Sequence, residues 1–152
     1  MRLFSDPEQI PQSYGLRIAV GLIGYFLIMQ ILGYAHVVEL RLLNLFILVA
    51  GVWYALKRFR ETHPEMNYFR ALVTGVATAA IGALSFAAFL FIYMISNDAL
   101  MQAIVENEPM GRFLNPYIVA CIVALEGLFS GLLVTFILIN YVETAEVNRP
   151  IG

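Results

Sequence analysis

Four long apolar runs, separated by short polar joints, dominate the pattern of hydrophobic and polar positions along the chain. They cover residues 14–36, 40–59, 66–95 and 117–142, and a helix needs about 20 apolar residues to cross a bilayer core roughly 30 Å thick. The joint HVVELR between the first two runs is so short that it predicts an antiparallel hairpin. We therefore predict an all-α fold, an integral membrane four-helix transmembrane bundle, in one domain over residues 1–152.

The third joint, SNDALMQAIVENEPMGRFLNPY, has a helical period of its own. Its residues separate onto an apolar side with Leu100, Met101, Ile104 and Val105 and a polar side with Asp98, Gln102 and Glu106. This pattern predicts a short amphipathic helix on the membrane surface. Asn115 and Pro116 then provide a cap and a first-turn proline for the fourth span.

The second joint is basic, and its charge indicates the orientation of the bundle in the membrane. It carries the cluster Lys57, Arg58, Arg60 and Arg70. If both termini are cytoplasmic, only Arg41 and Arg112 of the nine Lys and Arg residues lie on the outer side, as the positive-inside rule requires. We predict that orientation. The same cluster can bind anionic lipid headgroups, although topology alone explains it. In this joint Thr62 and Glu65 form a predicted capping box for the third helix.

Composition agrees with a membrane location and limits the chemistry. The chain is 61% hydrophobic and 13% charged, whereas soluble proteins average about 45–50% and about 25%. Its single cysteine, Cys121, provides no disulfide or CxxC motif. A net charge of -2 and segregated basic residues argue against nucleic-acid binding. We expect no cofactor, no metal and no catalytic residues.

One carboxylate stands out, in the stretch CIVALEGLFSGLLVTF of the fourth run. If the middle of each span marks the bilayer centre, Glu126 lies near that centre, at about the same depth as one polar residue on each other span. The predicted intramembrane polar cluster consists of Glu126, Gln30, Asn44, Ser85 and Ser130. Because an ionised carboxylate in that position costs at least about 2.5–3.5 kcal/mol, we expect Glu126 to be protonated and to face the bundle interior.

Two roles for this cluster stay open. Gln30 and Asn44 are equidistant from the hairpin tip, which favours a buried amide pair between the first two helices. Glu126 can then act as a neutral staple between helices or subunits, which is our first interpretation because no second acidic or basic residue lies near the middle of any span to relay a proton. The other is proton or ion coupling, the default hypothesis for an intramembrane acid.

Small residues recur with helical spacing on the last two spans. They are Gly75, Ala79 and Gly82 on the third and Ala120, Ala124, Gly127 and Gly131 on the fourth. Such stripes let two helix backbones approach closely. We predict that the third and fourth spans pack against each other along these residues.

The run KRFRETHPEMNYFRALVTGVATAAIGALSFAAFLFIY, followed by an acidic loop ending in NPY and a glycine-bearing last span, resembles domain-of-unknown-function family 4199. This is a family of small four-span bacterial membrane proteins. The resemblance covers nearly the whole chain in its layout. It implies a fold and a bacterial inner (cytoplasmic) membrane, and it implies no catalytic residues.

For function, the sequence favours a non-catalytic accessory or structural subunit of a larger bacterial membrane complex. Little of the chain lies outside the spans, no cofactor ligands assemble, and many Phe and Leu residues lie on faces that a small bundle cannot bury by itself. The expected partners are membrane lipids and other integral membrane subunits or further copies of the chain. The alternative is a small oligomeric proton-coupled transporter that uses Glu126.

Overall fold

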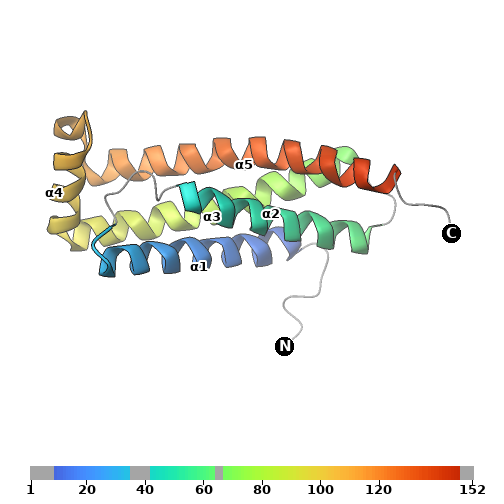
Figure 1. The fold of residues 1–152 in the computed structure, drawn as a ribbon, viewed down its shortest axis with the longest axis horizontal. Helices are drawn as coiled ribbons and strands as arrows, with labels where there is room; N and C mark the ends of the chain where they lie inside the picture. Colours follow the sequence, from blue (N-terminus) through green and yellow to red (C-terminus); the bar gives the residue numbers. More distant parts are fainter. Residues whose placement is uncertain (1–8, 35–41, 64–66, 148–152) are drawn as a thin grey trace.

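The computed structural model describes residues 9–34, 42–63 and 67–147, and the regular elements in these ranges are all helices. Four long helices lie side by side in a bundle, and a shorter helix crosses one end of it (Figure 1). The long helices are α1 (Ile10–Ile31), α2 (Leu42–Thr62), α3 (Tyr68–Ser96) and α5 (Pro116–Val147). The short helix is α4 (Asp98–Asn107), and the 3-10 turn η3 (Gly111–Phe113) leads from it to α5.

This architecture confirms the all-α prediction, with four helices that are long and apolar enough to cross a membrane. The helix α4 falls in the joint where a short amphipathic helix is expected, and its place on a membrane surface stays a prediction. The observed helices differ from the predicted spans at several ends. Helix α1 covers Ile10–Ile31 instead of 14–36, α2 covers Leu42–Thr62 instead of 40–59, and α5 ends at Val147 instead of residue 142.

Gly33 ends helix α1. Its backbone has φ +77°, a left-handed conformation that glycine adopts without a Cβ clash. The Gly33 N–H donates to the Gln30 carbonyl at 3.2 Å, and the Tyr34 N–H donates to the Met29 carbonyl at 2.9 Å. These two bonds form a Schellman motif, which satisfies the last carbonyls of the helix. The apolar run continues past this point, so hydropathy alone does not reveal the end of the helix.

Asparagine side chains cap the N-termini of three helices. Asn115 accepts a hydrogen bond from the Ile118 N–H at 2.9 Å, which confirms the predicted start of α5. Asn97 caps α4 through the Leu100 N–H. The start of α3 was predicted wrongly: the cap is Asn67, which accepts from the Phe69 N–H at 3.0 Å. Thr62 instead belongs to the end of α2, where its hydroxyl donates to the Phe59 carbonyl at 2.9 Å.

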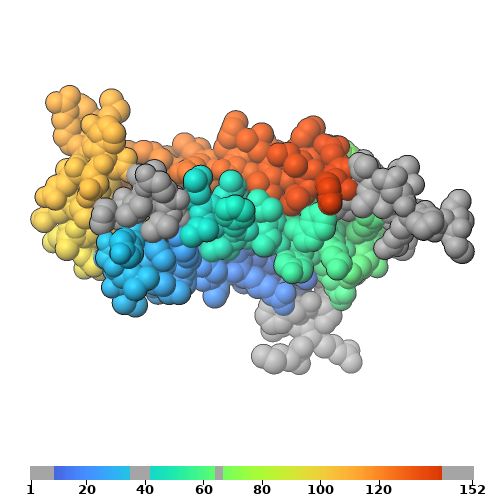
Figure 2. All heavy atoms as spheres, viewed as in Figure 1, coloured from blue at the N-terminus to red at the C-terminus, as the bar shows by residue number. Residues whose placement is uncertain are grey.

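Helix α3 is the centre of the bundle, because it packs against α1, α2 and α5. It is also the most buried of the four long helices. On one face of the molecule α2 lies between α1 and α5, as Figure 2 shows. Helices α1 and α5, by contrast, make at most a few contacts with each other within the described residues. Separation of α1 from α5 therefore depends on α2.

The interface between α3 and α5 is built on small residues. A Cβ atom added at Gly127 would lie 2.5 Å from the Ala83 Cβ, and one added at Gly131 would overlap the Ala79 Cβ. Further along, a Cβ at Gly75 would overlap the side chain of Thr135. Carbon atoms attract each other best at about 3.5–4.0 Å, so these positions accept only glycine at this separation of the two helices.

The other small residues of the predicted stripes have different neighbours. Gly82 does not face α5: a Cβ there would meet Ile18 of α1 at 2.6 Å and the Gly15 carbonyl oxygen at 3.3 Å. The contact with α5 continues instead at Ala83, four residues after Ala79, because ridges of residues four apart are what pack along a neighbouring helix. Ala120 packs at the edge of the smaller core cluster, and Ala124 is half-buried.

Two fully buried threonines satisfy their hydroxyl groups within their own helices. The Thr78 hydroxyl donates to the Thr74 carbonyl, and the Thr135 hydroxyl to the Gly131 carbonyl, both at 2.7 Å. A donor that is buried without a partner would cost about 1–3 kcal/mol. These threonines therefore sit in the apolar core without needing a polar group from another helix.

Candidate functional site

A cavity of about 450 Å³ lies in the bundle next to the start of α2. In Figure 1, α1, α3 and α5 continue toward α4, whereas α2 begins further from that end. Ligand pockets have volumes of about 300–1,000 Å³, so the space is large enough for a small organic molecule.

Every helix contributes to the wall of the cavity. The described lining residues are mostly large and apolar, and they include Leu22, Phe26 and Met29 of α1, Leu42, Leu45 and Leu48 of α2, Phe86 and Leu90 of α3, Leu100 and Ile104 of α4, and Val119 and Val123 of α5. Leu100 and Ile104 are the contribution of the helix that crosses the end of the bundle. The cavity is therefore enclosed by side chains from five helices and has a predominantly apolar surface.

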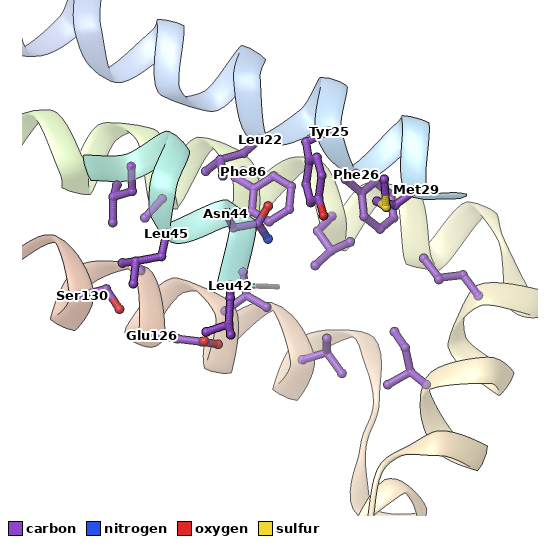
Figure 3. A pocket seen from close by; sticks show the side chains of 18 of the residues that line it. Leu22, Tyr25, Phe26, Met29, Leu42, Asn44, Leu45, Phe86, Glu126 and Ser130 are labelled. Atoms are coloured by element: carbon purple, nitrogen blue, oxygen red, sulfur yellow. The ribbon is translucent and has the colours of Figure 1, made fainter. Parts of the chain in front are cut away.

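Polar groups enter this apolar wall from three helices. Asn44 comes from α2, Glu126 and Ser130 from α5, and Tyr25 and Tyr34 from the α1 segment. Figure 3 shows Asn44, Glu126, Ser130 and Tyr25 around the space between the helices. The structure thus brings together three members of the predicted polar cluster, namely Asn44, Glu126 and Ser130. The other two, Gln30 and Ser85, are half-buried and are not among the described lining residues.

The side chain of Glu126 is exposed and borders the cavity. No hydrogen bond or ion pair joins its carboxylate to another residue in the described part of the chain. We expected this side chain inside a packed bundle, with one hydrogen bond to Gln30, Asn44 or Ser85; it instead borders open space. A staple between helices is therefore not formed among the described residues, and a staple between subunits stays a prediction.

Asn44 is the second unusual polar group. Its side-chain oxygen Oδ1 is buried, and it has no hydrogen-bond donor among the described residues. The predicted amide pair with Gln30 is therefore absent. The helix ends at Ile31 and Leu42 are still nearly equidistant from the predicted hairpin tip. Equal depth does not fix the rotation of a helix, and Asn44 lines the cavity whereas Gln30 is not among its described lining residues. A buried acceptor without a donor destabilises the folded state by about 1–3 kcal/mol, so Asn44 lowers the stability of the protein.

Sequence reasoning missed the aromatic side of the cavity. Phe26 of α1 meets Phe86, Phe89 and Tyr93 of α3 edge to face, with ring centroids 6.3, 6.1 and 5.4 Å apart. Phe26 and Phe86 also line the cavity. The spacing of Phe86, Phe89 and Tyr93 places them on one helical face, and this was the available signal. Such aromatic pairs contribute about 0.5–1.5 kcal/mol each and hold the wall in a defined shape.

The predicted lipid-headgroup residues lie at the other end of the bundle. Lys57, Arg58 and Arg60 are in the last turns of α2, and Arg70 is in the first turn of α3. All but Arg60 are exposed. Arg58 pairs with Glu61 at 3.3 Å, and an exposed ion pair of this kind contributes little to stability. The structure brings the four cations to one end, opposite α4, and their binding of anionic lipid stays a prediction.

Metal chemistry has no candidate ligand set in the described ranges. Within residues 9–34, 42–63 and 67–147, no group of three or more His, Cys, Asp or Glu side chains is arranged to hold a metal ion. Cys121 is exposed on α5. The candidate site is therefore the cavity, with its apolar wall and its polar residues Asn44, Glu126 and Ser130.

Comparisons with known proteins add no further assignment: no family model, curated protein or solved structure matches this chain. The resemblance to domain-of-unknown-function family 4199 therefore stays a prediction. The described residues define an all-helical protein with four candidate membrane spans and a partly open cavity between its helices.

Proposed function

We propose that this chain is a multi-pass membrane protein that binds a small amphipathic molecule in the cavity around Glu126. The observation that carries the proposal is the cavity itself, which combines a large apolar wall with a few convergent polar groups. That combination is typical of small-molecule sites, and such sites often lie between the helices of a bundle. The apolar wall would hold the body of the ligand, and Glu126, Asn44 and Ser130 its polar group.

The outer surface of the bundle supports the membrane location. Large apolar side chains remain exposed along it, for example Ile31 at 84%, Val20 at 70% and Phe129 at 66%. Removing such a side chain from water contributes about 1.5–3 kcal/mol, so a surface of this kind is stable in lipid. The bacterial inner membrane and the cytoplasmic termini belong to the same proposal; the first depends on the family resemblance and the second on the distribution of Lys and Arg.

The cavity also changes our preference between the two expected functions. An accessory subunit needs no open cavity with a carboxylate at its edge, whereas a transporter or a ligand-dependent membrane protein does. We therefore favour ligand binding, of which proton-coupled transport through Glu126 is one form. An accessory role stays the second candidate, supported by the exposed apolar residues of α5 such as Leu125, Leu132 and Phe136.

A pair of matched substitutions on α2 tests ligand binding. Leu45 lines the cavity, whereas Leu43 does not, and the two side chains are similarly exposed at 40% and 42%. Leu45→Trp should fill part of the cavity, and Leu43→Trp should leave it open. The probes are 4-phenylbutylamine, 4-phenylbutan-1-ol and 4-phenylbutyrate, which share one body and differ in the polar group.

Binding is measured by equilibrium dialysis of phosphatidylcholine nanodiscs that contain the protein against empty nanodiscs, so that partitioning into lipid is subtracted. We expect at least one probe to bind the wild-type protein and Leu43→Trp, and Leu45→Trp to bind it at least about tenfold more weakly. Absence of binding by all three probes, or equal binding by the two variants, would contradict the proposal. Unchanged elution and melting of both variants shows that the fold is intact.

A further inference from the structure

The polar groups that line the cavity favour a positively charged ligand. Glu126 is an exposed carboxylate at its edge, and Asn44 holds a buried Oδ1 with no donor among the described residues. We expected a protonated Glu126 in a packed interior; at the open edge of the cavity we take its carboxylate as ionised, and an ionised carboxylate only accepts hydrogen bonds. The amide of Asn44 and the hydroxyls of Ser130 and Tyr25 can donate as well as accept. A ligand with a positive charge and N–H donors would therefore complement Glu126, the charged residue among the described lining residues.

Cations of the protein do not neutralise this carboxylate within the described residues. None of the described lining residues is Lys, Arg or His, and the other titratable groups among them are Tyr25 and Tyr34. Lys57, Arg58, Arg60 and Arg70 lie at the opposite end of the bundle. Arg112 is near the end where α4 lies, but its guanidinium stacks over the Phe113 ring at 4.5 Å, outside the lining.

The apolar wall is also suited to a cation with an organic body. Tyr25, Phe26 and Phe86 contribute aromatic rings to the lining of the cavity, and aromatic faces attract ammonium groups. The rest of the wall is aliphatic, so it would bury the hydrocarbon portion of a ligand. A small inorganic cation has no hydrocarbon portion to bury against that apolar surface.

We propose that the cavity selects lipophilic organic cations, with a protonated amine as the preferred polar group, and that Glu126 is the residue that confers the selectivity. This inference rests on the proposed function, since it names the class of ligand that the same cavity takes. The carboxylate supplies the counter-charge and accepts hydrogen bonds from the ammonium group. An alcohol of the same body would fill the apolar wall without the charge, and a carboxylic acid would face repulsion from Glu126.

The test compares the three 4-phenylbutyl probes and adds a fourth, 4-phenylbutyltrimethylammonium, which keeps the positive charge and has no N–H donor. Dialysis against empty nanodiscs is carried out on the wild-type protein, on Glu126→Gln and on the control Glu106→Gln. Glu106 is an exposed carboxylate of α4 that does not line the cavity. The control therefore removes the same charge at another place.

We expect the wild-type protein and Glu106→Gln to bind the amine at least about tenfold more tightly than the alcohol, a difference of about 1.4 kcal/mol, and to bind the butyrate most weakly. In Glu126→Gln the amine and the alcohol should bind equally. The trimethylammonium probe should fall between the amine and the alcohol in the wild-type protein, because it keeps only the charge.

Two results would overturn the inference while leaving ligand binding intact: equal binding of the amine and the alcohol by the wild-type protein, or an amine preference that persists in Glu126→Gln. Binding of no probe at all would instead overturn the proposed function. Because the first comparison uses the wild-type protein alone, the inference stays testable even if Glu126→Gln does not fold.

Discussion

Helix α5 serves two regions that are packed in opposite ways. At Gly127 and Gly131 its backbone packs directly against Ala83 and Ala79 of α3, and no Cβ atom fits between them. Glu126 and Ser130, each one residue earlier, border a cavity, and Gly127 and Ala83 lie where the two regions meet, because they also line it. Successive residues of an α-helix point about 100° apart, so one helix turns a tight face to α3 and a polar, open edge to the space beside α2.

Residues of the α3–α5 interface stabilise the fold, whereas the polar residues of the cavity lower its stability. The α3–α5 interface has buried polar groups too, but Thr78 and Thr135 are hydrogen-bonded inside their helices. The cavity holds an acceptor of Asn44 that lacks a donor among the described residues. Unsatisfied groups and open space lower stability, and they are tolerated where function requires them. Substitutions in the two regions should therefore have opposite effects.

The largest effect is expected at the tight interface. Leucine at both Gly127 and Gly131 should abolish the folded form in detergent, because each side chain would overlap an alanine of α3 and overpacking costs about 1–3 kcal/mol per site. Leucine is the better helix former by nearly 1 kcal/mol, so the loss must come from packing. Ala88→Leu, at an exposed position of α3, is the control. Normal elution and melting of the double variant would show that the two helices are not in close contact.

An intermediate effect is expected where α1 ends beside the cavity. Gly33→Ala should lower the free energy of unfolding by about 1–2 kcal/mol, since a left-handed conformation costs a residue with a Cβ about that much. Gly24→Ala is the matched control: a Cβ at Gly24, inside α1, meets nothing within 4 Å, so that change should stabilise the helix by up to about 1 kcal/mol. The melting temperatures of the two variants should thus move in opposite directions; a shared direction would argue against the Schellman turn.

The smallest effect distinguishes a satisfied buried polar group from an unsatisfied one. Asn44→Leu should raise stability by about 1 kcal/mol, because it removes an acceptor without a donor among the described residues. Thr135→Val, which removes a hydrogen-bonded hydroxyl of nearly the same shape, should lower stability by about 0.5–1.5 kcal/mol. Chemical unfolding of both variants measures the contrast. A loss of stability in Asn44→Leu would mean that this amide has a partner in the native state.

Much of the fold could be predicted because it depends on signals that are local in the sequence. Apolar runs of sufficient length gave the four long helices, and Asn115 followed by Pro116 marked the start of α5 correctly. The end of α1 was missed because Gly33 lies within an apolar run, and only its positive φ shows that the helix stops there. The start of α3 was missed because Thr62 and Asn67 are both good capping residues, and sequence does not say which one the chain uses.

The candidate site was predictable only in part. Depth along the spans brought Glu126 and Asn44 to one layer, Ser130 was added because it lies one turn further along the same helix, and these three line the cavity. Depth does not fix the rotation of a helix, so Gln30 and Ser85 were grouped with them although they are not among the described lining residues. The assignment of Gly82 to the α5 side failed for the same reason, since Ala83 continues that contact. The cavity itself is lined by side chains of five helices, and no single segment of the sequence encodes how they are placed together.

Thiol accessibility tests the central claim, an open cavity beside Glu126, most directly. With the exposed Cys121 replaced by alanine, single cysteines are placed at Ser130, which lines the cavity, and at Phe129, which is exposed on the outer face. Both variants are treated with methyl methanethiosulfonate in phosphatidylcholine nanodiscs. The cavity predicts that Ser130→Cys reacts faster than Phe129→Cys and that saturating 4-phenylbutylamine slows only Ser130→Cys. Equal rates at the two positions, unaffected by the amine, would contradict it.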